Sequence, residues 1–522
     1  MIRKTVLAAL LGGSVLTFSG TAVAQEPAAA TQPEPTEPDQ SDATADAAIA
    51  AVAPTDDAEA KIELLQAQVE ALQEALEGVK SQMAKTTPSW KGGPQLEDKD
   101  AGWSFKPKGF MQWDAGYVGF PDGDERRGTV SNVNFANLGW NTRARRLVFG
   151  AEGTMPGGFG YKFELNLAQA TVDYEDIILT YDFKNKPLQI SVGNFYPYSS
   201  LETMTSSRLG SMLERASFTD AFNYNRRLGI GIQLSDKKAD SYLLQAGIFS
   251  QPINDFVGSN STTPNFQRTG WQASVRGVYS PMMGSTRLHI GANFQHRQNA
   301  QESLGTQYRT RPLTQLTDQR FIDTGTIAAK GDDVVGIELA AIHKSLHFAG
   351  EAQKLWVRDT FTPTQFAAIN GDPTDNDTAI GTAFNGSPSF WGGYAEVGYF
   401  LTGETRGYKG GKWDRTKVLK PFQDGGWGAI QVNGRIDYVK LSDRVDNSAT
   451  FVAPFYVNGG KQLGYQASVI WNPMDYLRFM AQFGHVDVTG GTRALGLADP
   501  TKPADKRKFG VNTAAVRAQL EF

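Results

Sequence analysis

The feature that most constrains this chain is an alternation of apolar and polar side chains that begins near Trp103 and continues to the end. In the last segment, Ala514, Val516, Ala518, Leu520 and Phe522 alternate with Ala515, Arg517, Gln519 and Glu521. Successive side chains of a β-strand point to opposite faces, so a period of two predicts strands. The pattern recurs about 16 times and predicts an all-β structure for residues 103–522.

Two kinds of connection separate these segments. Tight connections lie at residues 155–158, 184–187, 236–240, 281–284 and 472–475. Long polar connections lie at residues 119–139, 197–225, 251–268, 298–332, 358–389, 442–461 and 488–510. Long and short connections mostly alternate, as in transmembrane barrels with short periplasmic turns and long outer loops. We therefore predict an all-β transmembrane barrel of about 16 antiparallel strands.

A soluble β-sandwich or propeller is the competing architecture. The polar face carries Arg or Glu in strand after strand, so that face must meet water and the other must meet lipid or a second sheet. The chain has no Cys and ends in Phe522, and after its first residues it has no apolar run near the 18 or so residues that a membrane helix needs. These features favour a barrel whose apolar face meets lipid.

Four segments precede the barrel. Residues 1–24 combine Arg3 and Lys4, a short apolar core and a small-x-small site, which predicts a secretory signal peptide and a mature chain that begins at Gln25. Residues 25–57 are acidic and rich in Pro and Ala, which predicts a disordered linker. Residues 58–85 are predicted to form an α-helical coiled coil in the periplasm, because apolar residues alternate at spacings of 3 and 4 from Ile62 to Met83. A single amphipathic helix is the alternative, and residues 86–102 form a second linker.

The barrel segment resembles the phosphate-selective porin O/P family of bacterial outer-membrane porins. The resemblance covers residues 105–522 and is carried by residues 145–154, 161–167, 174–183, 192–196, 212–216, 226–229, 398–404 and 425–429. It implies a homotrimer of 16-stranded barrels in the outer-membrane lipid, with lumenal Arg and Lys that conduct anions, in some members phosphate. One position departs from the family: Tyr196 follows Gly193-Asn194-Phe195 where a lysine is often present.

The alternation also predicts which charged residues face the lumen. Residues 103–522 carry 44 Lys and Arg against 39 Asp and Glu, a mild excess that is too small and too dispersed for a nucleic-acid partner. The basic residues expected on the lumen face are Arg146, Lys162, Arg227, Arg276, Arg287, Arg435, Arg478 and Arg517. Some of them are expected to form cross-strand ion pairs with acids of the same face, and together they favour small anionic solutes.

A constriction is expected where a loop folds into the barrel. The first candidate is residues 197–225, which show a short helical pattern near residues 207–216 and carry Arg208 and Arg215. The second is residues 403–426, with Arg406, Lys409, Lys412, Arg415, Lys417 and Lys420. This stretch falls on the periplasmic side, and the resemblance implies that a periplasmic loop near it enters the barrel. The alternative is that its lysines are simply solvated.

The sequence gives no sign of catalysis. His343 and His347 have the spacing of a helical metal pair, but they lie where two predicted strands meet at a turn. We expect no enzyme activity, catalytic residue, metal or cofactor. Two functions remain: a porin for small anions such as phosphate or polyphosphate, or an envelope protein that tethers the outer membrane through its coiled coil. An open basic lumen would favour the porin, and a lumen filled with large apolar side chains would favour the tether.

Overall fold

The computed structural model describes residues 56–85, 89–90, 94–98, 100–121, 137–168, 172–253, 269–372, 377–443, 457–491 and 504–522. The predicted signal peptide and most of the predicted acidic linker lie outside these residues. Within them, no helix has the length and apolar character needed to cross a membrane. The helix α1 (Asp56–Lys85) and the β-structure are described separately below.

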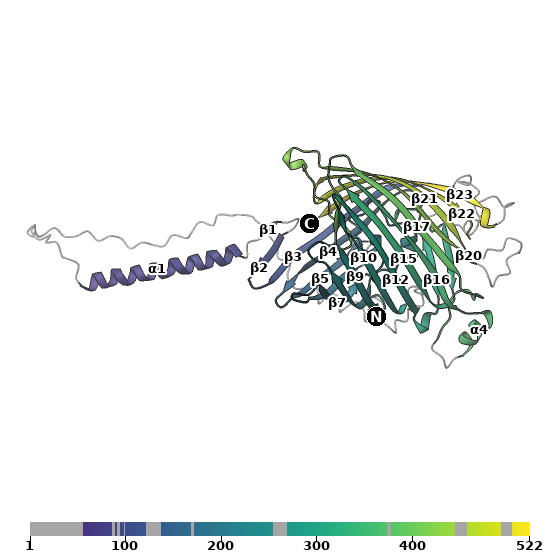
Figure 1. The fold of residues 1–522 in the computed structure, drawn as a ribbon, viewed down its shortest axis with the longest axis horizontal. Helices are drawn as coiled ribbons and strands as arrows, with labels where there is room; N and C mark the ends of the chain where they lie inside the picture. Colours follow the sequence, from purple (N-terminus) through teal and green to yellow (C-terminus); the bar gives the residue numbers. More distant parts are fainter. Residues whose placement is uncertain are drawn as a thin grey trace, which may run out of the picture. The chain divides into compact units, whose positions relative to one another are not determined.

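Sixteen antiparallel strands form a closed barrel, which confirms the predicted fold (Figure 1). They are β3 (Trp103–Val118), β4 (Gly139–Met155), β5 (Phe159–Asn166), β6 (Asp173–Asp182), β7 (Leu188–Phe195), β8 (Arg227–Ser235), β9 (Tyr242–Phe249), β10 (Thr269–Tyr279), β12 (Thr286–Asn299), β15 (Ala329–His343), β16 (Leu346–Thr360), β17 (Ser389–Phe400), β20 (Ala429–Asp443), β21 (Val457–Met474), β22 (Leu477–Thr489) and β23 (Lys508–Glu521). The barrel closes where β23 pairs with β3, from Thr513 opposite Val118 to Glu521 opposite Phe110. Closure leaves no unpaired edge, as a lipid environment demands.

Over most of the barrel wall, the alternation places apolar side chains outside and polar side chains inside. On β20, Ile436 is 54 % exposed on the outer face, whereas the neighbouring Arg435 and Asp437 are buried inside. On β22, Phe483 is 55 % exposed and Gln482 is buried. About half of the buried residues of this barrel are therefore polar or charged, and many large apolar side chains are exposed on its outer surface, which is unusual for a soluble globule.

Short turns join the strands at the end of the barrel that holds the chain terminus Phe522. The β4–β5 turn uses Gly157 and Gly158 with φ of 88° and 94°, a conformation that side chains disfavour. The β15–β16 turn follows His343 directly, so His343 and His347 lie on two strands and not on a helix. The connection from β17 to β20 is the long exception at this end, as the sequence indicated. It contains β18 (Gly407–Lys409), β19 (Lys412–Asp414) and the 3₁₀ helix η3 (Phe422–Asp424).

The long connections lie at the other end. The connection from β12 to β15 contains η2 (Gln301–Ser303) and the two-stranded β13 (Thr306–Thr310) and β14 (Ile322–Ile327). The connection from β16 to β17 contains α4 (Pro363–Gly371), which Thr362 caps. Barrels of this kind carry long loops on the outer side, which assigns this end to the cell exterior. The remaining small elements are β1 (Ser89–Trp90), β2 (Pro94–Asp98), β11 (Met282–Met283) and η4 (Ala504–Lys506).

The helix α1 spans the residues for which a coiled coil is predicted. Its seam residues Ile62, Leu65, Val69, Leu72 and Leu76 are each more than half exposed in the single chain. An exposed apolar seam on a helix is a surface that association would bury. The coiled coil itself stays a prediction, because it concerns contacts between chains.

Candidate functional site

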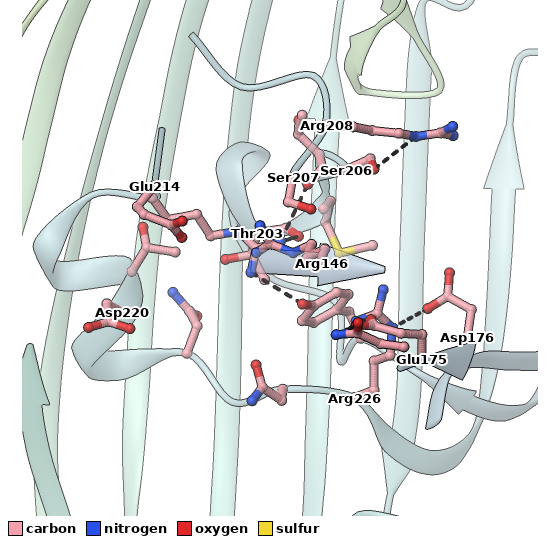
Figure 2. A pocket seen from close by; sticks show the side chains of 18 of the residues that line it. Arg146, Glu175, Asp176, Thr203, Ser206, Ser207, Arg208, Glu214, Asp220 and Arg226 are labelled. Carbon is pink, nitrogen blue, oxygen red and sulfur yellow. Dashed lines mark hydrogen bonds and ion pairs between the residues drawn. The ribbon is translucent and has the colours of Figure 1, made fainter. Parts of the chain in front are cut away.

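A cavity of about 970 Å³ occupies the barrel interior (Figure 2). One side is formed by inward residues of β3 to β7, and the other by residues 196–226, which we call the inner segment. Two longer pieces add to the lining: residues 306–327 from the outer end, called the outer hairpin, and residues 403–426 from the short-turn end, called the inner loop. Pro252 and Ile253 line it as well. The cavity thus lies between five strands of the barrel wall and segments of the chain that have folded in from both ends.

The inner segment is fastened to the opposite half of the wall, β10 to β23. Gln295 Nε2 donates to Ser199 Oγ at 2.8 Å. Ser217 N donates to Asp437 Oδ2 at 2.7 Å, and Glu202 N donates to Glu351 Oε1 at 2.8 Å. Its two short helices, α2 (Leu201–Met204) and α3 (Ser217–Phe222), bury Leu201, Phe218 and Phe222 completely. This packing narrows the lumen to the side that faces β3 to β7.

The prediction of a short helix near residues 207–216 is wrong. This stretch is irregular and lies between α2 and α3. Wall side chains bind the backbone groups that a helix would have paired. Leu213 N donates to Gln482 Oε1 at 2.8 Å, and Ser211 O accepts from Ser468 Oγ at 2.6 Å. Arg208 O accepts from Arg478 Nη1 at 2.9 Å. These tertiary hydrogen bonds satisfy the backbone without a helical turn.

Most of the arginines expected on the lumen face point inward but are covered by the inner segment or by the inner loop. Arg276 binds Glu338 at 2.7 Å, Arg435 binds Glu396 at 2.6 Å, and Arg517 binds Asp114 at 2.6 Å. Arg478 donates to inner-segment carbonyls, and the guanidinium of Arg227 lies 4.6 Å from the ring centre of Tyr224. Arg287 donates to Ser280 O and Asp240 O near the short turns. None of these six residues lines the described cavity.

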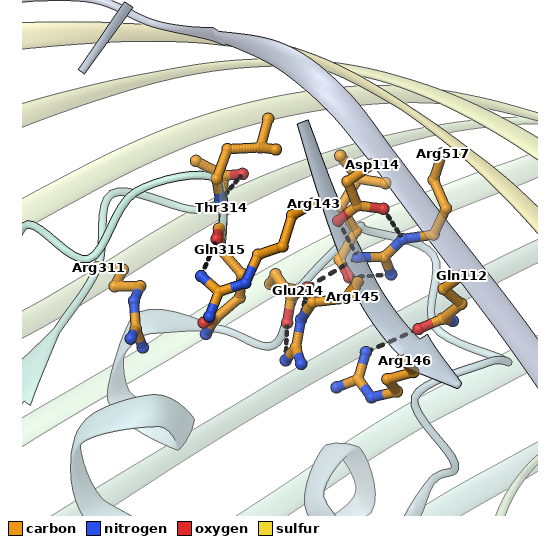
Figure 3. A network of polar contacts seen from close by, with 12 residues as sticks. Gln112, Asp114, Arg143, Arg145, Arg146, Glu214, Arg311, Thr314, Gln315 and Arg517 are labelled. Carbon is orange, nitrogen blue, oxygen red and sulfur yellow. Dashed lines mark hydrogen bonds and ion pairs between the residues drawn. The ribbon is translucent and has the colours of Figure 1, made fainter. Parts of the chain in front are cut away.

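Arg146 and Lys162 do line the cavity. Lys162 binds Asp176 at 2.5 Å and Glu164 at 2.9 Å. Arg146 donates to Gln112 Oε1 at 2.8 Å, and no carboxylate of the described residues lies within 4.0 Å of its guanidinium (Figure 3). Arg146 therefore retains a charge that a solute in the cavity can meet.

Arg145 also lines the cavity, although the alternation assigns consecutive residues to opposite faces. A register shift explains this: Gln112 pairs with Arg146 while Trp113 pairs with Ala144, so Arg145 is the extra residue of a β-bulge. Arg145 Nε binds Glu214 at 2.8 Å (Figure 3). Burial alone would raise the pKa of the Glu214 carboxyl, but the nearby arginines lower that pKa well below its usual range. Glu214 is thus ionised at neutral pH.

The inner loop brings two of its basic residues to the cavity. Gly411 O accepts from Arg276 Nη2 at 2.7 Å, and Trp413 N donates to Thr205 Oγ1 at 3.3 Å, so the β18–β19 hairpin lies inside the barrel. Lys409 and Lys412 line the cavity. Four other candidates of this loop do not: Arg406 is buried over the Trp413 ring, Arg415 pairs with Glu521, and Lys417 and Lys420 are exposed.

The two candidates on the inner segment both reach the cavity. Arg208 binds Glu521 at 3.2 Å. Arg215 Nη1 donates to the hydroxyl of Tyr196 at 3.3 Å, and its guanidinium lies 5.0 Å from the Tyr196 ring centre. The Arg226 guanidinium lies 4.3 Å from the same ring centre. Tyr196 therefore has two arginines at its ring.

The sequence did not single out the outer hairpin, which supplies Arg309, Arg311 and Arg320 to the lining. Arg143 Nη1 donates to Gln315 O at 2.6 Å and ties the hairpin to β4 (Figure 3). The run of three arginines within residues 306–327 was the available signal. It was missed because outer loops of a barrel are ordinarily solvated and nothing local indicates that one folds inward.

The charge balance of the lining is basic. The cavity is lined by 12 Lys and Arg residues and 8 Asp and Glu residues. Among the described residues, five of these cations have no carboxylate within 4.0 Å: Arg146, Arg215, Arg309, Lys409 and Lys412. By the same criterion only Asp173 and Asp414 lack a cationic partner. Uncompensated charge in the cavity is thus mainly positive.

A closed 16-stranded barrel with a polar interior and chain folded inward defines a channel of the porin class. Residues 106–522 match the family of phosphate-selective porins O and P, and the chain belongs to that family of outer-membrane channels. Both the family and the fold are those of a channel and not of an enzyme.

Three similar proteins accompany this assignment. The chain is 36 % identical over 442 residues to a Caulobacter vibrioides protein described as uncharacterized, with 84 % of this chain and 78 % of that protein covered. It is 25 % identical over 404 residues to Porin O of Pseudomonas aeruginosa, with 75 % and 85 % covered. Comparison with the outer-membrane channel DcaP of Acinetobacter baumannii gives 14 % identity and a TM-score of 0.43, with 81 % and 98 % covered.

Proposed function

We propose that this porin conducts small anions, phosphate among them, in preference to cations. The observation that carries the proposal is the imbalance of unpaired charge in the cavity, five cations against two carboxylates among the described residues. Positive groups inside a low-dielectric wall concentrate anions and repel cations. The proposal requires no binding step, because a passive channel needs only a polar lumen, a constriction and a matching field.

The test is the zero-current potential across a planar bilayer under a KCl gradient. We expect the wild-type channel to favour chloride. The variant Lys412→Glu with Arg309→Glu changes the lining from 12 basic and 8 acidic residues to 10 of each, so the chloride preference should fall to near zero or reverse. Lys417→Glu is the control, because Lys417 is exposed and does not line the cavity. A wild-type channel that favours potassium would refute the proposal.

We do not expect this channel to select phosphate strictly over other anions. Tyr196 stands where the family resemblance leads us to expect a lysine, and one of its two neighbouring arginines, Arg226, is neutralised by Glu175 and Asp176. Arg215 has no carboxylate partner within the part of the chain that the structure describes, and it can contact a passing anion. We therefore expect the channel to show no preference for phosphate over chloride. When the two potassium salts are compared in the same bilayer, the permeabilities of the two anions should differ only as their mobilities differ.

We further propose that the channel is a homotrimer and that its α1 helices form a coiled coil. The support is the exposed seam of α1, with Leu72 69 % exposed and Leu65 58 % exposed.

Because the chain has no Cys, Val69→Cys introduces a single thiol at a seam position. Oxidation should link two chains through Val69→Cys but not through Glu70→Cys on the next face. Adding Leu65→Asp and Leu72→Asp should abolish the link, since a buried charge forces the helices apart. Equal linking at both positions would contradict the coil.

A further inference from the structure

A row of lysines crosses the outer surface of the barrel near its outer end. Strand register places Lys354 of β16 opposite Trp391 of β17, and Trp391 opposite Lys440 of β20. Lys440 lies opposite Lys461 of β21, and the row continues through Thr489 of β22 to Lys508 of β23. We call Lys354, Lys440, Lys461 and Lys508 the lysine row. Figure 1 shows β16, β17, β20 and β21 on one flank of the barrel.

These side chains point away from the channel. Trp391 is 46 % exposed, and Lys354 and Lys508 are exposed. Cross-strand partners share a face, so Lys440 and Lys461 lie on this outer face as well. Ile436 lies four residues from Lys440 on β20, and Tyr465 lies four residues from Lys461 on β21. Both are exposed on the outer face, and residues an even number apart on a strand share a face, which confirms that the two lysines point outward. The lysine row is therefore separate from the anion cavity and cannot serve conduction.

The row has no internal charge compensation. None of the described carboxylates lies within 4.0 Å of any of its four ammonium groups. Lys440 and Lys461 are directly opposed, and like charges at opposed positions destabilise a sheet. Neighbouring strands lie about 4.8 Å apart, so the row spans about 24 Å across six strands. A bound anion between the lysines would offset this repulsion.

Aromatic side chains place the row at the level of lipid headgroups. The Lys354 ammonium lies 5.0 Å from the ring centre of Trp356, and the rings of Trp391 and Tyr438 lie 4.8 Å apart. Trp and Tyr gather where hydrocarbon meets headgroups. A lipid-facing Lys is costly at the bilayer midplane but costs little near the interface, which agrees with this level.

We propose that the lysine row binds the phosphate groups of a glycolipid headgroup in the outer leaflet. Lysine suits phosphate as a compact cation, and lysines spread over about 24 Å match a headgroup that carries more than one phosphate. The row would hold the lipid against the β16–β21 flank while the channel works independently. The proposal rests on the outer-membrane location and not on the anion preference of the lumen.

Native mass spectrometry of the full chain in neutral detergent tests this, with bisphosphorylated lipid A as the probe and its dephosphorylated form as the comparison. The wild type should retain the phosphorylated lipid, and Lys440→Gln with Lys461→Gln should lower the retained fraction about tenfold, since two charge-assisted contacts are lost. Lys440→Arg with Lys461→Arg should restore retention and so excludes a folding defect. Lys184→Gln with Lys186→Gln, in the exposed β6–β7 turn, is the matched control and should bind as the wild type does.

Three results would overturn the proposal: equal retention of the dephosphorylated lipid, unchanged retention by the Gln pair, or displacement of the lipid by excess inorganic phosphate, which would identify a simple anion site. The zero-current potential of the Lys440→Gln, Lys461→Gln channel should equal that of the wild type. This measurement separates failure of the lipid proposal from failure of the anion-channel proposal.

Discussion

The inward-facing arginines of this barrel have two different roles, and strand alternation alone does not predict which role a given arginine has. Arg517 is buried under the inner segment, where it binds Asp114 at 2.6 Å and Glu214 at 2.8 Å. Arg146, on β4, has only an amide partner among the described residues and faces the cavity. The first arginine joins the inner segment to the wall, and the second is available to a solute.

Removing Arg517 should therefore destabilise the barrel more than it alters selectivity. Arg517→Ala would leave Asp114 buried without its cation, and loss of one partner from a buried pair costs about 3–5 kcal/mol. Denaturant unfolding in detergent, followed by tryptophan fluorescence, measures this loss. The double variant Arg517→Met with Asp114→Leu should recover much of it, because replacing both partners leaves no uncompensated charge. A single variant as stable as the wild type would show that the network is dispensable.

Among the elements, the inner segment decides where the channel runs. Its irregular stretch is held by wall side chains of β21 and β22, including Ser468 and Gln482. Each such bond contributes about 0.5–1.5 kcal/mol, so the segment depends on several acting together. The amino-acid sequence of the segment names none of these partners, because they lie more than 200 residues further along the chain.

Loosening this attachment should make the channel fluctuate. Gln482→Ala with Ser468→Ala removes the partners of Leu213 N and Ser211 O, so the segment should move more freely and single-channel current noise should rise. Gln466→Ala is the matched control, because Gln466 is also buried on β21 but makes no side-chain hydrogen bond among the described residues. Equal current noise from the control would mean that any cavity in the wall disturbs the current. It would contradict the conclusion that attachment of the inner segment steadies the channel.

For the molecule as a whole, the sequence predicted the wall of the barrel far better than its interior. Period two is imposed locally by the strand itself, so the closed 16-stranded barrel and the inward direction of residues such as Arg276 followed from it. Segments that are distant in the sequence decide whether an inward-facing residue is covered or reaches the cavity. Three pieces fold into the barrel, and they bury Arg276 and Arg435 while bringing Arg309 and Lys412 to the cavity. The bulge at Arg145 likewise arises from pairing with β3 and has no local signal.

The same whole-molecule view predicts how selectivity should depend on salt. The five unpaired cations come from β4, the inner segment, the outer hairpin and the inner loop, so they act on a solute as a shared field and not as one binding site. The Debye length falls from about 10 Å at 0.1 M to about 3 Å at 1 M salt. The shorter length is well below the edge, roughly 10 Å, of a cube with the cavity's volume of about 970 Å³. The chloride preference from zero-current potentials should therefore decline steadily as both KCl solutions are raised at a fixed ratio. The Lys412→Glu, Arg309→Glu channel should show little salt dependence, because it has little net field to screen. A preference that persists unchanged in molar KCl would instead indicate direct contact at one narrow site, with Arg146 and Arg215 as the residues to substitute next.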